Sequence, residues 1–117
     1  LTEEQELIKM TARDFAAREV RPMAALNDRE GKFPKELVDK LGELGFMGMM
    51  VPEEYGGSAL GCVSYVISLE ELCAACASTG IIMSVNNSLV CSPILAFGSE
   101  EQKKAYLPDL ASGKKLG

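Results

Sequence analysis

Three pairs of adjacent glutamates are the residues best suited to acid–base chemistry: Glu53/Glu54, Glu70/Glu71 and Glu100/Glu101. Neighbouring side chains on a helix point about 100° apart, so the two members of a pair do not share a site. Most of these glutamates are explained either by the favourable position of negative charge at the start of a helix or by a solvent-exposed helix face. Glu70 and Glu71 lie in an apolar stretch, where we expect a salt bridge or a position at the rim of the core.

Nucleophilic and metal chemistry has few candidates. The chain has no His, so it cannot build a Ser–His or Cys–His arrangement by itself. Cys73 and Cys76 match a C-x-x-C pattern, but no strand precedes them, and packed core thiols explain them better than a redox pair. Their spacing to Cys62 and Cys91 fits no common zinc site. We therefore expect four reduced thiols and no metal site.

A polar run, Asn86-Asn87-Ser88, separates two apolar segments. It has two interpretations that the sequence does not decide between. These side chains would either cap free backbone groups at a helix end or form the polar lip of a ligand pocket. Spacing alone thus provides no complete catalytic set.

Composition restricts the class of protein. The 117 residues suffice for one domain, and 12 basic against 17 acidic residues give a net charge of −5, which argues against a nucleic-acid partner. No uninterrupted apolar run reaches the roughly 18 residues of a membrane span, so none is predicted. The abundance of Ala, Leu, Met, Glu and Lys favours helices.

Two capping patterns, Thr2-Glu3-Glu4-Gln5 and Ser99-Glu100-Glu101-Gln102, mark helix starts because a hydroxyl is followed three residues later by Gln. The first predicts a helix from about residue 2 to 21, with a bend or restart at Pro22. The second predicts a helix that Pro108 interrupts. A further helix opens at Pro34 and stops near Gly45.

The middle of the chain is predicted as follows. Residues 46–51 are apolar but too few for a helix, so we expect them to cross the core as extended chain. A helix follows over about 60–77 and breaks at Thr79-Gly80. Residues 81–85 are β-branched, but a lone strand would have no partner, so we predict a helix that ends at about 86–92. Pro93 then starts another helical stretch. The result is an all-α domain over residues 1–117, a helical bundle of five or six helices.

Four segments together resemble a known family: VPEEYGG, SLEELCAACASTG, SVNNSLV and PILAFGSEEQKKAYLP. In order and spacing they are similar to the N-terminal helical domain of acyl-CoA dehydrogenases. The Ser78-Thr79-Gly80 break followed by Ile81–Leu89 is most similar to the short-chain (butyryl-CoA) members. The likeness covers nearly the whole chain.

This resemblance implies a flavoprotein that binds FAD and oxidises a short-chain acyl-CoA to the trans-2-enoyl-CoA in fatty-acid β-oxidation. It implies electron transfer to an electron-transfer flavoprotein, a homotetramer, and a location in the mitochondrial matrix or, alternatively, the bacterial cytoplasm. The family's catalytic base and most of its FAD contacts come after Gly117, in a middle β domain and a C-terminal helical domain. The resemblance therefore implies no catalytic or cofactor-binding residue within this chain.

What the resemblance assigns to this chain is one wall of the acyl pocket. By position, the predicted substrate-binding residues are Ile82, Val85, Asn86 and Leu89. Ile82, Val85 and Leu89 recur at i, i+3 and i+7, so they share a helical face. Bulky aliphatic groups there would shorten the cavity and favour short acyl chains.

Two alternatives remain. A flavin-dependent acyl-CoA oxidase or monooxygenase would share the same architecture, and a glutamate poised at the flavin would discriminate. A stand-alone helical interaction module would lack a large exposed apolar face. The dehydrogenase interpretation predicts the opposite, an apolar face left open where the middle domain docks.

Overall fold

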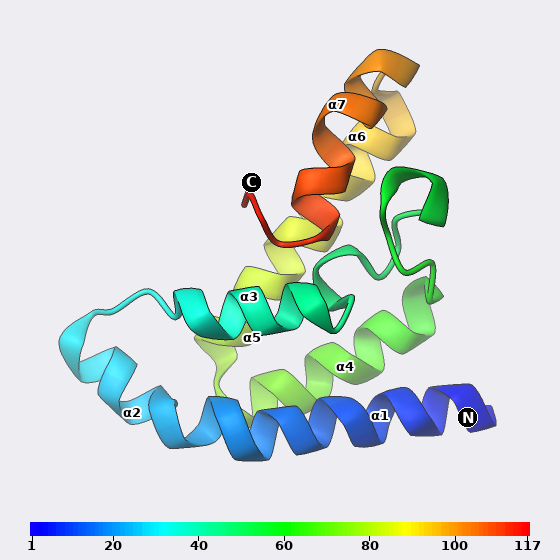
Figure 1. Cartoon of the computed structure of the whole chain (residues 1–117). Helices are drawn as coiled ribbons and strands as arrows, with labels where there is room; N and C mark the ends of the chain where they lie inside the picture. Colours follow the sequence, from blue (N-terminus) through cyan, green and yellow to red (C-terminus); the bar gives the residue numbers. More distant parts are fainter.

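The computed structural model describes all residues from Leu1 to Gly117. The domain is all-α and contains no strand, as the sequence predicts. Its seven α-segments join into five continuous helices, which form a flat body of 41 × 36 × 18 Å (Figure 1).

The first long helix combines α1 (Glu3–Phe15), a π segment (Ala16–Val20) and α2 (Arg21–Glu30). Its start is the predicted capping box. The N–H of Gln5 donates to Thr2 Oγ1 at 3.2 Å, and the N–H of Thr2 donates to Gln5 Oε1 at 3.0 Å. The same reciprocal pair caps α7 (Glu100–Ala111) through Ser99 and Gln102.

The second long helix runs without a gap through α5 (Ala77–Ser84), a π segment (Val85–Cys91) and α6 (Ser92–Phe97). The predicted end at residues 86–92 is therefore wrong. It was expected because the run there is polar and a proline follows it. The structure pairs the backbone of this run within the helix and turns two of its side chains inward.

Each π segment ends two residues before a proline, at Val20 before Pro22 and at Cys91 before Pro93. The N–H of Arg21 donates to the carbonyl of Ala16, and the N–H of Ser92 donates to that of Asn87, each five residues back. Proline lacks an N–H, and its ring crowds the carbonyl four residues earlier. The wider π turn relieves this crowding, so each helix continues past its proline. The restart expected at Pro22 is a π turn within one helix.

Pro108 does not interrupt α7, contrary to the prediction. It lies on the exposed side of the helix, whereas Leu107 and Leu110 beside it are buried. The last turns of α7 are therefore retained by the packing of those leucines.

α3 (Lys35–Glu43) follows Pro34 and ends before Gly45, whose φ of +79° is the left-handed conformation expected at a helix stop. The next residues form a 3₁₀ turn, Phe46–Gly48, rather than extended chain. Phe46, Met47 and Met49 are all buried. A strand would bury only alternate side chains, so a tight turn buries this run more completely.

α4 (Gly61–Ala75) and α5 are separated at Cys76, which has an extended backbone with φ −159° and ψ 109°. The break predicted at Thr79-Gly80 is three residues too late, and both residues lie inside α5. Gly80 is there for close packing, since a Cβ on it would lie 2.3 Å from Cys73 Sγ. Residues 81–85 are helical, as predicted.

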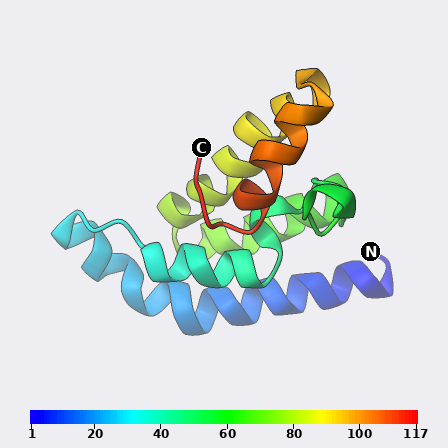
Figure 2. The same ribbon diagram turned by 45° about the horizontal axis from the view of Figure 1, so that its top comes forward.

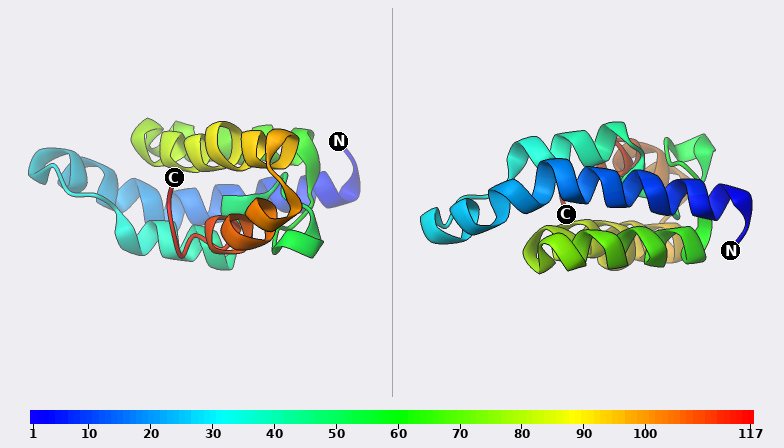
Figure 3. Two further views of the ribbon diagram at one scale, coloured as in Figure 1. Left: turned by 90° about the horizontal axis from the view of Figure 1, so that it is seen from above. Right: turned by 90° about the horizontal axis from the view of Figure 1, so that it is seen from below.

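Two apolar clusters form the core. The larger cluster joins α1, α3, α4 and α5 to the 3₁₀ turn, and the smaller one joins the π segment Val85–Cys91 to α7. Figures 1 and 2 show the hairpin of α6 and α7 projecting away from the layer of α1, α3 and α4, and the view from below in Figure 3 shows α1 between α3 and α4. All four cysteines are free thiols.

The continuous helix Ala77–Phe97 is, by length and composition alone, apolar enough to cross a membrane. The sequence reading missed this length because it divided the helix at residues 86–92. Core helices of other proteins pass the same test, so the finding is weak evidence of a span. Only 28% of its apolar window is buried within this domain. The rest of the helix is partly covered or exposed, and its exposed residues are mostly apolar.

Candidate functional site: a helix with one anchored face and one open face

The four predicted substrate-binding residues lie on the helix Ala77–Phe97 but not on one face of it. Asn86 is 1% exposed and points into the domain, whereas Leu89 is 68% exposed. Val85 is half-buried, and so is Ile82, which packs against the larger core cluster. The helix carries no carboxylate, Lys or Arg.

On the inner face, the amide of Asn86 bridges two distant segments. Its Nδ2 donates to the carbonyl of Met47 at 2.9 Å and to that of Leu110 at 2.9 Å. Its Oδ1 is buried and has no partner. Both amide hydrogens are therefore used within the domain.

Asn87, by contrast, uses both its amide oxygen and its amide nitrogen. Its Oδ1 accepts the N–H of Met49 at 2.9 Å, and its Nδ2 donates to the carbonyls of Phe46 at 2.9 Å and Met83 at 3.0 Å. Both asparagines thus satisfy backbone groups, as one of the two sequence interpretations proposed. They do so in the middle of a helix rather than at its end, and most of the groups belong to other segments.

The outer face of the helix is an apolar stripe at four-residue spacing. We call it the open stripe; its members are Ile81, Val85, Leu89, Pro93 and Phe97. Phe97 is 89% exposed, and Ile81 is 58% exposed. The sequence analysis chose Ile82 and overlooked Ile81, Pro93 and Phe97. The signal that would have found them is the four-residue repeat of apolar residues.

The open stripe continues into hollows between α6 and α7. Cavities of about 260 Å³ and 400 Å³ share Ile94 and Tyr106 in their walls. Val90 and Leu116 line the first, and Phe97 lines the second. Apolar side chains dominate this surface, so it can bind hydrocarbon or another apolar protein surface. The carboxylate of Asp109, which also lines the first cavity, is paired with Lys114 and Lys115.

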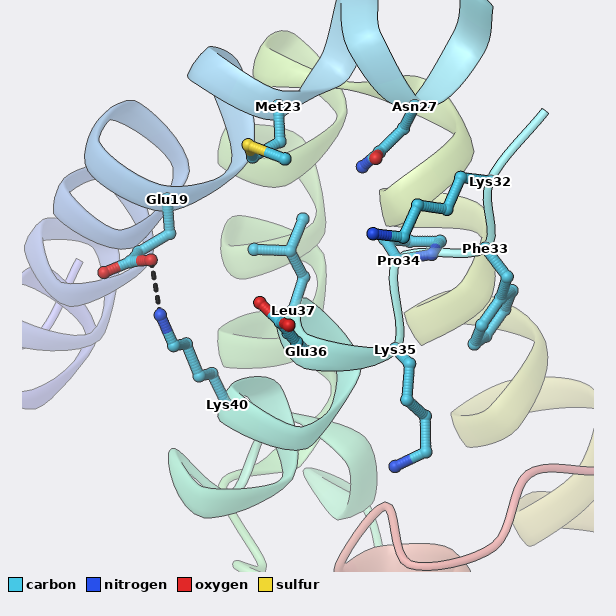
Figure 4. Close-up of a pocket in the computed structure, with 10 residues that line it drawn as sticks. All are labelled: Glu19, Met23, Asn27, Lys32, Phe33, Pro34, Lys35, Glu36, Leu37 and Lys40. Carbon is cyan, nitrogen blue, oxygen red and sulfur yellow. Dashed lines mark hydrogen bonds and ion pairs between the residues drawn. The ribbon is translucent and has the colours of Figure 1, made fainter. Parts of the chain in front are cut away.

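A separate cavity of about 350 Å³ lies between α2 and α3 (Figure 4). It contains none of the predicted site residues. Its charges are largely paired: Lys40 Nζ lies 2.6 Å from Glu19 Oε2, and Lys35 pairs with Asp39. Met23 and Leu37 contribute apolar wall, and no Cys or Ser nucleophile lines it.

The titratable groups with shifted pKa values lie off the open stripe. Burial raises the pKa of Cys91 to about 11. Burial also acts to raise the pKa of Cys76, but hydrogen bonds from the hydroxyl and N–H of Thr79 and from the N–H of Ser78 outweigh it and lower that pKa. Neither thiol is hydrogen-bonded to a base: Cys91 is shielded by burial, and the carboxylate of Asp28 near Cys76 acts against its ionisation.

A flavin would need convergent polar contacts. The buried side-chain atoms without a partner, Ser68 Oγ and Asn86 Oδ1, are both enclosed within the domain. They therefore offer no contact to an isoalloxazine ring or a pyrophosphate.

Comparison with known proteins identifies relatives along the whole chain. The short-chain specific acyl-CoA dehydrogenase of Bos taurus mitochondria is 50% identical over 117 residues, covering 100% of this chain and 28% of the relative. The short-chain specific acyl-CoA dehydrogenase of Clostridium acetobutylicum is 47% identical, covering 100% of this chain and 31% of the relative. The chain thus spans less than a third of the length of these relatives.

Solved structures show the same fold. A chain in a structure reported for the electron transferring flavoprotein of Acidaminococcus fermentans superposes with a TM-score of 0.95 at 44% identity, covering 100% of this chain and 31% of that one. Butyryl-CoA dehydrogenase from Megasphaera elsdenii gives 0.90 at 38% identity, with coverage of 100% and 31%. Acyl-CoA dehydrogenase complexed with FAD from Bacillus anthracis gives 0.88 at 38% identity, with coverage of 99% and 20%.

The matched family is described as acyl-CoA dehydrogenase, N-terminal domain, and the match extends over residues 2–114. It agrees with the fold, with the relatives and with the solved structures. The chain therefore belongs to the acyl-CoA dehydrogenase family as an N-terminal domain.

Proposed function

We propose that the chain is the N-terminal domain of a FAD-dependent acyl-CoA dehydrogenase that converts a short-chain acyl-CoA to the trans-2-enoyl-CoA. In this proposal the domain supplies one wall of the acyl pocket. The catalytic base and most of the FAD contacts come from other segments of a longer product. The observation that carries the proposal is the open stripe, an uncovered apolar face on a helix without a single charge.

An exposed apolar stripe favours a role in which something apolar covers it. Each buried methylene contributes about 0.8 kcal/mol, so a face of five apolar residues is unfavourable to leave in water. A short acyl chain covers only part of such a face. The middle domain would cover the remainder, including the hollows between α6 and α7.

Within the pocket wall we keep Ile82, Val85, Asn86 and Leu89 as the proposed substrate-binding residues. The exposure of Leu89 and the partial exposure of Val85 support direct contact with the acyl chain. Ile82 would act from behind, through its packing on the core. For Asn86 the donors are already used, so its role would be indirect.

The remaining features of the proposal rest on the relatives. The structure from Bacillus anthracis holds FAD, which supports FAD as the cofactor of the complete product. The similar chain from Acidaminococcus fermentans occurs in a structure reported for an electron transferring flavoprotein, which supports such a protein as the electron acceptor. Homotetramer formation and a location in the mitochondrial matrix or bacterial cytoplasm complete the proposal.

The test uses the longer gene product. We expect a yellow protein with flavin absorbance that oxidises butyryl-CoA with an artificial electron acceptor. Val85→Ala and Ile82→Ala should raise kcat/KM for hexanoyl-CoA relative to butyryl-CoA by roughly tenfold, the low end of what one methylene contributes to discrimination. Leu26→Ala, on the exposed side of α2, is the matched control and should leave the ratio unchanged.

Each negative outcome points to a different conclusion. A product without flavin would overturn the proposal. Flavin reoxidation by molecular oxygen, with no need for a flavoprotein acceptor, would indicate the oxidase or monooxygenase alternative. An unchanged ratio in both pocket variants would show that the wall has been assigned to the wrong residues.

A further inference from the structure

The polar run in the middle of the helix Ala77–Phe97 does more than satisfy backbone groups. We propose that Asn86 and Asn87 are positioning residues for the acyl pocket: they anchor the π segment Val85–Cys91 and thereby hold Val85 and Leu89 in line on the open stripe. This inference rests on the proposed function, because it concerns how the same wall is shaped.

The alignment of the stripe depends on the π segment. Four residues of α-helix turn through about 400°, so a four-residue repeat drifts by about 40° at every step. A π turn takes more residues per turn, so the same repeat drifts back in the opposite direction. The π segment lies at the centre of the stripe, between Ile81 and Phe97. The π segment therefore cancels part of the angular rotation that would otherwise place Ile81 and Phe97 on different sides of the helix.

A π turn is a rare conformation and needs support. Here the two asparagines supply it from the inner face. Asn86 reaches the carbonyls of Met47 and Leu110, and Asn87 reaches the backbone of Phe46 and Met49. Two adjacent residues can both point inward in this way because the segment is wider than an α-helix.

Serine side chains complete the support within the helix itself. Ser88 Oγ donates to the carbonyl of Ser84 at 2.7 Å, and Ser92 Oγ donates to the carbonyl of Asn87 at 3.0 Å. The second contact reinforces the bond from the N–H of Ser92 to the same carbonyl. Just before the segment, Ser84 Oγ accepts a hydrogen bond from the hydroxyl of Tyr65 in α4 at 3.0 Å, whereas Oδ1 of Asn86 has no partner.

The experiment measures acyl-length preference in the full-length flavoprotein. Asn86→Leu and Asn87→Leu keep the side-chain volume roughly but remove the anchoring bonds. We expect the ratio of kcat/KM for hexanoyl-CoA to that for butyryl-CoA to change by roughly tenfold, with the flavin content retained. Arg13→Met is the control: it removes the ion pair with Glu71 between α1 and α4 without touching the π segment or the core on which Ile82 packs, and it should leave the ratio unchanged.

The outcomes separate positioning from stability. If the asparagine variants lose activity by the same factor on both substrates, the residues are merely structural and the inference is overturned. If neither leucine variant yields a folded flavoprotein, the ratio is measured for Asn86→Ser instead. Serine keeps a polar group at this buried position but is too short to reach both carbonyls. A wild-type product that oxidises neither substrate would overturn the proposed function itself, and this inference with it.

Discussion

The guanidinium of Arg13 donates two parallel hydrogen bonds to the carboxylate of Glu71, from Nε to Oε2 at 3.0 Å and from Nη2 to Oε1 at 2.8 Å. The pair links α1 to α4 across 58 residues of sequence. It realises the salt bridge that the sequence analysis expected of Glu70 or Glu71. A bidentate geometry of this kind is stronger than an ordinary surface ion pair.

The first prediction concerns how the stability of the fold changes as the pH falls, which depends on the Arg13–Glu71 pair. The hydrogen bond from Arg13 lowers the pKa of Glu71, so the pair stabilises the fold above the unfolded glutamate value of about 4.3. This contribution is lost as the pH falls through the lower folded value. We expect Arg13→Met to shift the acid-unfolding midpoint to higher pH, as measured by circular dichroism across a pH series. Arg18→Met, which removes the exposed Arg18–Asp14 pair at 3.8 Å, should leave the midpoint nearly unchanged.

A second prediction concerns alkaline pH. The hydroxyl of Tyr55 donates to Glu100 Oε2 at 2.8 Å, and this bond, followed by burial, raises the pKa of Tyr55 to about 12. A raised pKa contributes stability that is fully present below the unfolded value of about 10 and is lost as the pH rises through about 12. Glu100→Gln should lower this pKa, as measured by the ultraviolet absorbance of tyrosinate. Glu101→Gln serves as the control, and an equal shift in both variants would contradict the assignment.

A third prediction concerns the contact of α4 with α5. Gly80→Ala would place a Cβ 2.3 Å from Cys73 Sγ, so we expect it to destabilise the protein by about 1–3 kcal/mol, as overpacking typically does. The double variant Cys73→Ala/Gly80→Ala removes the sulfur and should recover most of that loss. The nearest remaining atoms are the backbone N and Cα of Cys73, at 3.3 Å and 3.4 Å.

Urea unfolding of the two single variants and the double variant checks this third prediction. Additive losses in the double variant would mean that the clash with the sulfur is not the cause. Cys73→Ala alone is the reference for the cost of removing the thiol. An intact fold with unchanged stability in Gly80→Ala would show that α4 and α5 can separate freely.

Signals that depend on neighbouring residues predicted the structure well. Both capping boxes formed as expected because Thr2 and Ser99 need only the Gln three residues ahead. The stop at Gly45 follows from its freedom to adopt positive φ. The all-α class likewise follows from composition and helical spacing.

Signals that depend on distant segments were misread. Pro22, Pro93 and the polar run 86–88 each look like a helix end when only the adjacent residues are considered. The helices accommodate these residues because π turns form before the prolines and because backbone acceptors in the 3₁₀ turn and in α7 bind the polar side chains. The residues adjacent in sequence give no sign of either. The position of Gly80 reflects a neighbour in α4 rather than a break in the chain.

The four residues predicted to bind substrate all lie on one helix, but they point to different sides of it. The i, i+3, i+7 rule assumes a uniform α-helix, and the π segment changes which residues line up. The rule grouped Ile82 with Val85 and Leu89 and therefore did not point to Ile81 or Phe97. Asn86 was named from the family resemblance and not from this rule. The four-residue repeat is visible in the sequence, but the π register that lines it up is seen only in the backbone hydrogen bonds of the structure.

The bonds that anchor the π segment join side chains on one side to the backbone on the other, and this difference affects which positions can change in evolution. Asn86 and Asn87 contribute specific amides, whereas Phe46, Met47 and Leu110 contribute only peptide carbonyls, which every residue type possesses. Substitutions at the acceptor residues therefore preserve the contact as long as the backbone keeps its path. On the donor side, almost any replacement abolishes it. Selection for a constant pocket would thus fall on two adjacent codons and leave their distant partners comparatively free.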